Sequence, residues 1–449
     1  ARYPADLYRR YMLWKCSPID LMFFSFKEMN ERPYQFLNTL YNLHRYLQEN
    51  GTYDRFNPKS FTLDSAEAGS LLEPADRWIL SRLQDLIQRV TEGYESAQYN
   101  FLLSLIEAFV IEDLSRNYVP MIRRELWSDA PETYGRRMAV YSVLWHALRS
   151  VMLLLNPMIP HFAEAMHQNV FLSFDDSLPL SINFEDWPRV EKRFRDTSLE
   201  ESFNTLLEVV SLSNSARQAA KVKRRWPLSR MLVVVPKGRL QGITLLKDLL
   251  RELSNVQEVL ISSDPRGTGV GLKVSLNLSS AGPKLRGLTG QVASVLKLLD
   301  GYDVRQRLEA DQKLLLEIGQ TKVELRSEDL VFTYEPPEGY SLVADGELLV
   351  GVDIRRDDVL IGKGLMRDIA RRLQALRKEL NLKPSDYLKC AYIFGLDDES
   401  QNLIRPYLAE MRDLVRSRGV VICRDKGDVD VQWNEFEMDD RKILLALSP

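Results

Sequence analysis

The chain has 449 residues, of which 45% are hydrophobic and 27% are charged, and its formal net charge is -3. This composition fits a folded protein of about three domains, and the charge excludes a protein that is basic over its whole surface. We find no uninterrupted apolar run that could cross a bilayer and no secretory signal in the opening ARYPADLYRR, so we expect a cytoplasmic protein. The first residue is Ala rather than Met, which indicates a piece of a longer chain.

The spacing of apolar residues between positions 36 and 171 predicts a helical bundle, because they recur every three or four residues. The expected helices, in chain order, are 36–47, 74 to just past 94, 102–127, 134–155 and 160–170. Pro120 removes a backbone donor from the third helix, so we expect a kink there.

After Trp187-Pro188 the pattern changes to short β-branched runs that alternate with helices. A helix from about 199 to 225 precedes Pro227. The expected strands are 231–235, 256–261, 270–278, 322–334, 341–354, 388–394 and 420–423, and the further helices are 240–253, 288–299, 366–380 and 399–418. The predicted fold class is therefore an α-helical bundle followed by a mixed α+β region.

This reading divides the chain into three segments. Residues 1–190 form the bundle, with 1–32 as a lead-in, residues 191–228 form a connecting basic helix, and residues 229–449 form an α+β domain. A further division of the last segment into 229–310 and 311–449 is a second option.

No residue pattern indicates a catalytic or metal centre. Gly362-Lys363-Gly364 lacks the spacing of a Walker loop, and the acidic pairs 175–176 and 439–440 lie in polar stretches typical of solvated charge. Structural roles are expected for the histidines and reduced thiols for the cysteines, because neither set has metal-ligand or disulfide spacing. These residues are His44, His146, His161, His167, Cys16, Cys390 and Cys423.

One stretch has a one-sided charge. Between Val209 and Lys247 there is no Asp or Glu, while nine Lys and Arg residues occur. On a helix, Arg217, Lys221 and Arg224 would share one face, and such a stripe can follow a phosphate backbone. The alternative is a solvated helix face. The candidate nucleic-acid-binding residues here are Arg217, Lys221, Lys223, Arg224, Arg225 and Trp226.

A second candidate lies on the third bundle helix. Arg116 and Arg123 are two turns apart on the face opposite the apolar stripe, and Asn117 lies beside them. Arginine planes and amides suit unstacked bases. The alternative is that these arginines pair with Glu112 or Glu125.

Several motifs resemble the class I aminoacyl-tRNA synthetases for isoleucine, valine and leucine. Ala5, Asp6, Arg9, Ser17 and Pro18 fit the segment that follows the KMSKS loop in that group. Further matches are FLNTLYN at 36–42, DRWILSRL at 76–83, FVIEDLSRNYVPMIR at 109–123 and NPMIPHFAE at 156–164.

Three later motifs are similar to the isoleucine enzyme in particular. They are KVKRRWPL at 221–228, ELSNV at 252–256 and GLMRDI at 364–369. Lys363 stands where this family usually has glutamate, and Ser254 interrupts the second motif. The lack of a cysteine zinc module resembles the archaeal and eukaryotic-like form.

The resemblance implies the C-terminal part of an isoleucyl-tRNA synthetase, with an anticodon-binding domain and an appended domain. The HIGH and KMSKS motifs are not present, so this chain alone is expected to be non-catalytic and without a cofactor, whereas ATP and Mg belong to the parent enzyme. The implied partners are tRNA(Ile) and the catalytic and editing domains, with neither membrane nor DNA. The alternatives are the same region of a valyl or leucyl enzyme, or a helical scaffold that binds protein.

Overall fold

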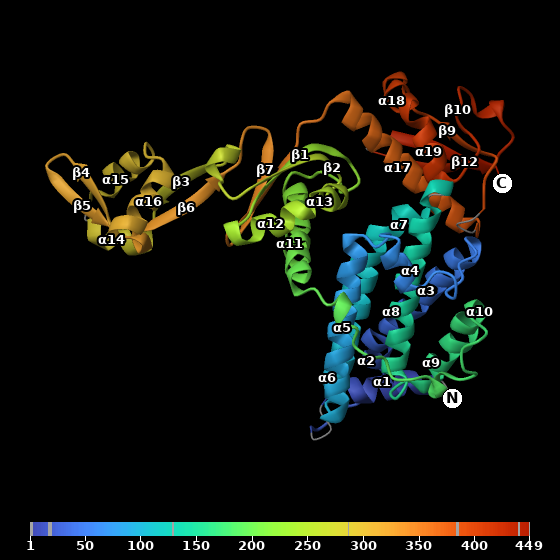
Figure 1. Cartoon of the computed structure of the whole chain (residues 1–449). Helices are drawn as coiled ribbons and strands as arrows, with labels where there is room; N and C mark the ends of the chain where they lie inside the picture. The colour runs from blue at the N-terminus through green and yellow to red at the C-terminus, as the bar shows by residue number, and fades with distance from the viewer. Residues whose placement is uncertain are drawn as a thin grey trace. The chain divides into compact units, whose positions relative to one another are not determined.

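The computed structural model describes residues 3–16, 20–127, 130–285, 287–382, 386–438 and 441–448. The chain divides into two compact units, Ala1–Phe203 and Asn204–Pro449, and the division falls inside helix α11 (Thr197–Ala219) (Figure 1). That point lies within the predicted connecting segment 191–228. The finer predicted division at 310/311 stays a prediction. The predicted fold class, a helical bundle followed by an α+β region, is confirmed.

The described part of the first unit is built from helices without strands. Its elements are α1 (Ala5–Lys15), α2 (Phe26–Asn30), α3 (Arg32–Tyr53), α4 (Leu63–Ala68), α5 (Pro74–Glu95), α6 (Tyr99–Ala108), the π-helical stretch η1 (Phe109–Tyr118), α7 (Val119–Trp127), α8 (Tyr134–Leu155), α9 (Pro160–Met166), η3 (His167–Phe171) and α10 (Leu172–Phe174). All five helices predicted between 36 and 171 are present. The lead-in motif residues Ser17 and Pro18 lie outside the described residues.

Helix α8 forms the centre of the bundle core. Within the described residues, only the span Pro131–Leu155 is long and apolar enough to cross a membrane, but 89% of its most apolar window is buried inside the structure. Such burial is typical of a core helix in a bundle. The apolar composition of α8 is therefore explained by packing against α3, α5 and α7.

The predicted helix 102–127 is a continuous run of α6, η1 and α7. Pro120 lies in the first turn of α7, directly after the π-helical stretch. A proline cannot donate a backbone hydrogen bond and its ring crowds the carbonyl four residues before it, here that of Arg116. The wider π-helical turns of η1 end at Tyr118, so Pro120 lies where the helix changes from π-helical to α-helical geometry. The helix continues through Pro120 to Trp127.

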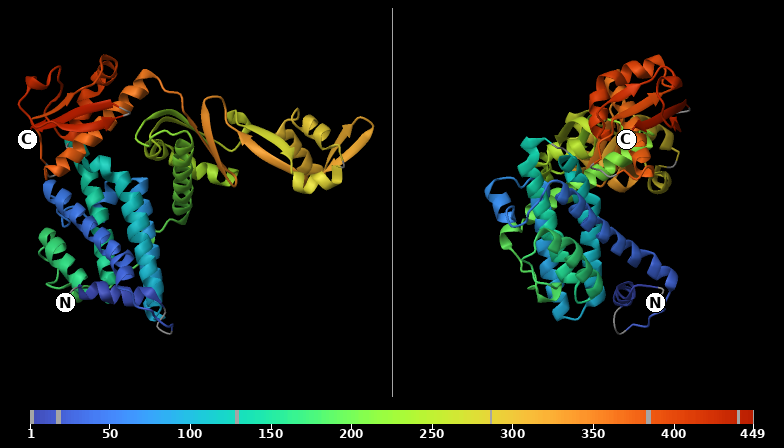
Figure 2. Two further views of the ribbon diagram at one scale, coloured as in Figure 1. Left: turned by 180° about the vertical axis from the view of Figure 1, so that it is seen from behind. Right: turned by 90° about the vertical axis from the view of Figure 1, so that its right-hand side faces the viewer.

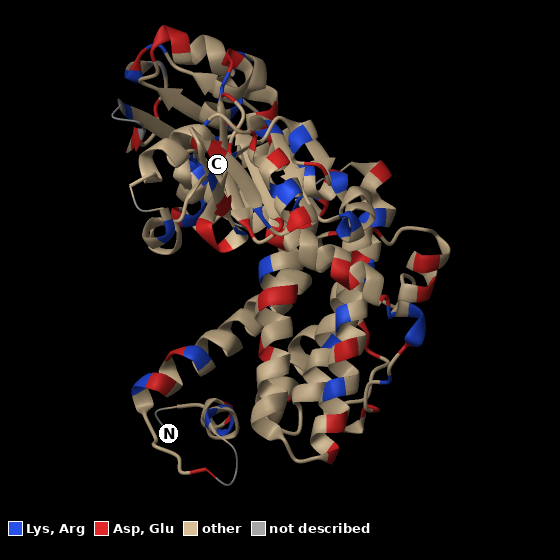
Figure 3. Ribbon diagram, turned by 90° about the vertical axis from the view of Figure 1, so that its left-hand side faces the viewer, with Lys and Arg blue, Asp and Glu red and all other residues tan. Residues whose placement is uncertain are grey.

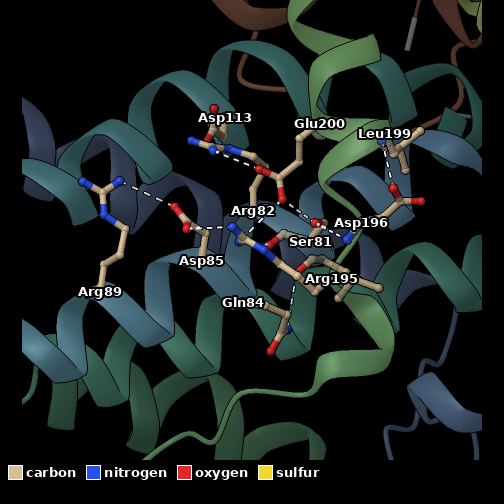
Figure 4. Close-up of polar contacts among 11 residues, drawn as sticks. Ser81, Arg82, Gln84, Asp85, Arg89, Asp113, Arg195, Asp196, Leu199 and Glu200 are labelled. Carbon is tan, nitrogen blue, oxygen red and sulfur yellow. Dashed lines mark hydrogen bonds and ion pairs between the residues drawn. The ribbon is translucent and has the colours of Figure 1, made fainter. Parts of the chain in front are cut away.

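A polar network on α5 fixes the start of α11 (Figure 4). Arg82 on α5 donates through Nε to Asp113 on η1 at 3.0 Å and lies 3.4 Å from Glu200 on α11. The Ser81 hydroxyl donates to the other oxygen of Glu200 and accepts the backbone N–H of Asp196 at 2.8 Å. Asp196 in turn caps α11 by accepting the N–H of Leu199 at 2.9 Å (Figure 4). One arginine therefore links three helices.

The second unit begins with a four-stranded sheet of order β2-β1-β8-β7. Its strands are β1 (Leu228–Val234), β2 (Val256–Ser262), β7 (Tyr340–Asp345) and β8 (Leu348–Asp353). Helices α12 (Lys237–Leu245) and α13 (Lys247–Leu253) join the parallel pair β1 and β2. The predicted strand 341–354 is a hairpin of β7 and β8 instead, because Gly346 and Glu347, with a positive φ at Gly346, form a two-residue turn.

A lobe with its own apolar core is inserted between β2 and β7. It contains β3 (Gly271–Leu276), α14 (Leu278–Leu285), α15 (Thr289–Leu296), α16 (Gly301–Asp311), β4 (Leu314–Ile318), β5 (Thr321–Leu325) and β6 (Leu330–Glu335). Figure 2, left, shows the antiparallel pair of β3 and β6 with the helices of the lobe next to it. The predicted strand 322–334 is wrong, since a turn at Ser327–Asp329 separates β5 from β6.

The C-terminal part packs helix α17 (Asp358–Glu379) against a sheet of order β10-β9-β12-β11. Its other elements are β9 (Cys390–Phe394), α18 (Asp398–Ile404), α19 (Leu408–Val415), β10 (Val420–Ile422), β11 (Asn434–Met438) and β12 (Arg441–Ser448). Strands β11 and β12 were not predicted. The acidic pair 439–440 lies outside the described residues.

Candidate nucleic-acid interface

Helix α11 ends at Ala219, six residues before the predicted end at 225. Lys221 has a φ of 56°, its N–H donates to Gln218 O at 3.0 Å, and the N–H of Val222 donates to Arg217 O at 2.8 Å. These two bonds form a Schellman motif, which reverses the chain after a helix. The prediction that Arg217, Lys221 and Arg224 form one helical stripe is therefore wrong.

Arg217 is a buried structural cation. Its side chain is 1% exposed, and it donates to the backbone carbonyls of Trp226 at 2.8 Å, Ser254 at 2.7 Å and Asn255 at 3.0 Å. Burial lowers the pKa of Arg217 to about 10, with a smaller contribution from the charge of Arg224. A phosphate cannot reach a side chain that is buried in this way. The burial of Arg217 therefore contradicts its predicted direct contact with a phosphate.

The basic segment 221–226 is anchored to α17 by one buried carboxylate, that of Asp368. Arg225 forms an ion pair with it through Nε, Lys223 Nζ lies 3.4 Å from it, and the indole N–H of Trp226 donates to it at 3.3 Å. Asp368 is 0% exposed and Trp226 is 7% exposed. Trp226 is thus part of the core, and Lys223 and Arg225 are partly neutralised.

Asn255 connects the same segment to the start of β2. Its side-chain N–H donates to Arg224 O at 3.1 Å, and its side-chain oxygen accepts from Arg367 on α17. Its φ of 52° is in the left-handed region, which Asn tolerates better than most residues. The three motifs at 221–228, 252–256 and 364–369 therefore meet in space. Sequence reasoning singled out the motifs but assigned no role to Asn255 or Asp368.

Two cations of the segment remain available to a ligand. Lys221 and Arg224 are both exposed, and no acidic partner of either is present among the described residues. The backbone that follows Arg224 is held, because its carbonyl accepts from Asn255 and the next residue, Arg225, is anchored to Asp368. A phosphate could therefore meet these two side chains on a fixed backbone.

The two arginine candidates on the bundle are exposed, but each has a partner within the bundle. Arg116 Nη1 lies 2.6 Å from Glu112, one turn earlier on η1, which is the pairing expected as the alternative. Arg123 forms a side-chain hydrogen bond with Tyr46, whose pKa burial raises to about 12. Asn117 is half-buried between these arginines in the chain. Base recognition by Arg116, Asn117 and Arg123 stays a prediction.

The histidines do not form a site together. His44 is buried, its Nδ1 lies 2.7 Å from Leu40 O, and burial lowers its pKa to about 4. His167 is also buried, with Nε2 2.7 Å from Pro179 O, and burial lowers the pKa of His146. Across the described ranges, no group of three or more His, Cys, Asp and Glu side chains could hold a metal ion. None of the three cysteines forms a disulfide within the described residues, and Cys423 is buried.

Basic and acidic residues are interspersed along the ribbon of both units (Figure 3). Neither unit is basic throughout, in agreement with the net charge of -3. Nucleic-acid binding would therefore depend on local groups of unpaired cations such as Lys221 and Arg224 rather than on the charge of the whole protein.

A family model described as "Anticodon-binding domain of tRNA ligase" matches residues 76–232. This match contains most of α5, the helices from α6 to α8, all of α11 and the basic segment 221–226. Both groups of candidate residues therefore lie within the matched region.

Curated relatives match the chain well beyond this domain. A protein named isoleucine–tRNA ligase from Methanopyrus kandleri is 31% identical over 459 residues, which cover 99% of this chain and 40% of the relative. Proteins of the same name from Methanosarcina mazei and Pyrococcus abyssi are 32% and 28% identical, over 85% and 96% of this chain and 36% and 39% of theirs. The chain spans about two fifths of the length of these relatives.

Proposed function

We propose, on the premise that this chain belongs to the isoleucine–tRNA ligase family, that it binds the tRNA for isoleucine and recognises its anticodon. The observation that carries this proposal is the match of the anticodon-binding family to residues 76–232, which contain the exposed cations Lys221 and Arg224. The relatives that match nearly the whole chain carry the name of the isoleucine enzyme.

In this proposal the two candidate groups have different tasks. Lys221 and Arg224 contact phosphates and position the tRNA, while Arg116, Asn117 and Arg123 contact bases and give specificity. Arginine and asparagine can stack on or hydrogen-bond to splayed bases of a loop, which is how single-stranded RNA is usually read. Lys223 and Arg225 are held next to this contact, because both are paired with the carboxylate of Asp368.

The aminoacylation reaction belongs, in this proposal, to a longer ligase in which catalytic and editing domains join isoleucine to its tRNA with ATP and magnesium in the cytoplasm. The residues of this chain do not fit a nucleotide site at Gly362-Lys363-Gly364, because that triplet lies inside helix α17. A Cβ at Gly362 would lie 2.3 Å from the carbonyl oxygen of Leu403, so this glycine allows close packing. The proposed contribution of the chain is binding energy and identity.

The proposal is tested by titrating the chain with transcripts of isoleucine, valine and leucine tRNAs at about 50 and about 200 mM salt. The expected result is tightest binding of the isoleucine tRNA and a steep loss of affinity with salt. A Lys221→Glu plus Arg224→Glu variant should lose most of this binding. The matched control, Lys297→Glu plus Lys322→Glu on the inserted lobe, should keep it.

Each alternative has its own outcome in the same titration. Tighter binding of the valine or leucine tRNA would assign the chain to that enzyme instead. Binding that is absent, or that does not change with salt, would favour a scaffold for a protein partner.

A further inference from the structure

Two cations from distant parts of the chain lie close to the indole ring of Trp226. Lys223 Nζ lies 5.8 Å from the ring centroid, and the guanidinium of Arg356 lies over the ring at 5.0 Å. Helix α17 also packs on this ring, since a Cβ at Gly364 would lie 2.5 Å from it. Arg356 is therefore next to the basic segment, although it lies outside the stretch 209–247.

Arg356 is held in place without being neutralised. It belongs to the short connection between β8 and α17, and it is exposed. Its neighbour Arg355 is paired with Asp353 at 2.7 Å, and Asp357 caps α17 by accepting the N–H of Leu360 at 2.8 Å. The described residues offer Arg356 no ion pair. Stacking on an indole orders a guanidinium and leaves the donors at its edge free for a ligand.

Three cations near Trp226 are not part of the anchor at Asp368. Asp368 supplies one buried negative charge, and it is shared by Lys223 and Arg225. Three further cations, Lys221, Arg224 and Arg356, have no acidic partner in the described part of the chain. Asp357 and Asp358 follow Arg356 in the sequence. The side chain of Asp357 accepts from the first turn of α17, and Asp358 is exposed. These three exposed cations are therefore open to an anionic ligand.

We propose that Arg356, together with Lys221 and Arg224, forms a binding surface for the phosphate backbone of RNA. The two parts of this surface come from the ends of different elements, α11 and β8, and Trp226 holds them together. A guanidinium offers a planar fork that contacts two phosphate oxygens at once, which suits a phosphodiester better than a base edge or an apolar peptide. This inference rests on the proposed function and adds a contact that the basic stretch does not contain.

The test compares Arg356→Gln and Arg356→Lys in the full chain, with the isoleucine tRNA transcript as the probe. The loss of one phosphate contact should weaken binding severalfold at low salt and reduce the slope of log affinity against log salt by about 0.7–0.9. Arg356→Lys should keep the slope of the wild type because it keeps the charge. Lys297→Gln, which removes an exposed cation from the inserted lobe, is the charge-matched control and should leave affinity and slope unchanged.

The outcomes separate this inference from the function on which it rests. If the wild-type chain binds the tRNA but Arg356→Gln and Lys297→Gln give the same slope as the wild type, the inference is wrong and the proposed function stands. If the wild-type chain shows no salt-sensitive binding, both are wrong. A thermal unfolding midpoint equal to that of the wild type shows that Arg356→Gln is folded. If the midpoint of Arg356→Gln is lower than that of the wild type, the salt slope of the folded Arg356→Lys variant is used instead. A slope of Arg356→Lys that is reduced as far as that of Arg356→Gln would mean that the charge at 356 has no role.

Discussion

The indole N–H of Trp226 donates a hydrogen bond to the carboxylate of Asp368 across 3.3 Å, although the two residues are 142 positions apart. The same carboxylate accepts Arg225 and lies 3.4 Å from Lys223. A single residue of α17 therefore orders the basic segment that follows α11. This relationship makes the shape of the segment depend on α17.

Replacing Asp368 should destabilise the second unit. Asp368→Ala removes the acceptor of a buried indole N–H and of two cations, so the free energy of unfolding should fall by about 3 kcal/mol. Asp368→Asn keeps one acceptor oxygen and should cost less. Urea denaturation measures both values. A loss below about 1 kcal/mol for the alanine variant would show that the anchor is weak.

Arg217 and Arg224 should respond in opposite ways to truncation. Arg217→Ala removes the donor of the backbone carbonyls of Trp226 and Ser254, and we expect a loss of about 2–3 kcal/mol of unfolding free energy. The carbonyl of Asn255 keeps the N–H of Leu228. Arg224→Ala removes an exposed side chain and should change stability by less than about 0.5 kcal/mol, while RNA binding falls severalfold. Denaturation and tRNA titration on both variants provide the check, and equal stability changes would contradict the assignment.

Lys221→Gly should raise stability and weaken RNA binding at the same time. The left-handed backbone at Lys221 costs a non-glycine residue about 1 kcal/mol, and glycine removes that cost together with the charge. Lys221→Ala is the control, because it removes the charge and keeps the strain. The two variants should differ in melting temperature but not in affinity for tRNA. A glycine variant no more stable than the alanine variant would rule out backbone strain at 221.

Glu125 should contribute stability to the first unit that is lost as the pH rises toward neutrality. Burial raises the pKa of Glu125 from 4.5 to about 7, and Arg136, which lies 2.8 Å from it, only partly offsets this because it also serves the buried Asp76. The protonated form is favoured in the folded state, so this stability is present below about pH 4.5 and lost as the pH rises through about 7.

The size of this effect is at most about 3 kcal/mol, and a comparison of the wild type with Glu125→Gln isolates it. The unfolding free energy of the wild type, relative to that of Glu125→Gln, should decrease as the pH rises from acidic to mildly alkaline values. If the difference is independent of pH, the pKa of Glu125 is the same in the folded and unfolded states, and burial does not raise it.

The bundle could be predicted well from the sequence because its signal is local. The apolar stripes of α3, α5 and α8 repeat within each helix, and Pro74 marks the start of α5. The exposed groups of the bundle, such as Arg116, were also identified, because each lies opposite an apolar stripe.

The basic segment was predicted less well because its shape depends on distant partners. No glycine marks the end of α11, and the reversal at Lys221 places Val222 and Trp226 in the core. The burial of Arg217 depends on carbonyls near 254, and the role of Asp368 depends on α17. Strands β11 and β12 were missed for the same reason, since β12 pairs with β9 far back in the chain.

The most direct test of the central claim exchanges only the anticodon. The isoleucine tRNA transcript and the same transcript with a valine anticodon are titrated against the wild-type chain at one salt concentration, and the reverse exchange is made in the valine tRNA. We predict that affinity follows the isoleucine anticodon in both molecules, because a mismatch at a base contact typically costs about 1–3 kcal/mol by analogy with other nucleic-acid readers. Equal affinity for the four transcripts would contradict anticodon recognition by this chain.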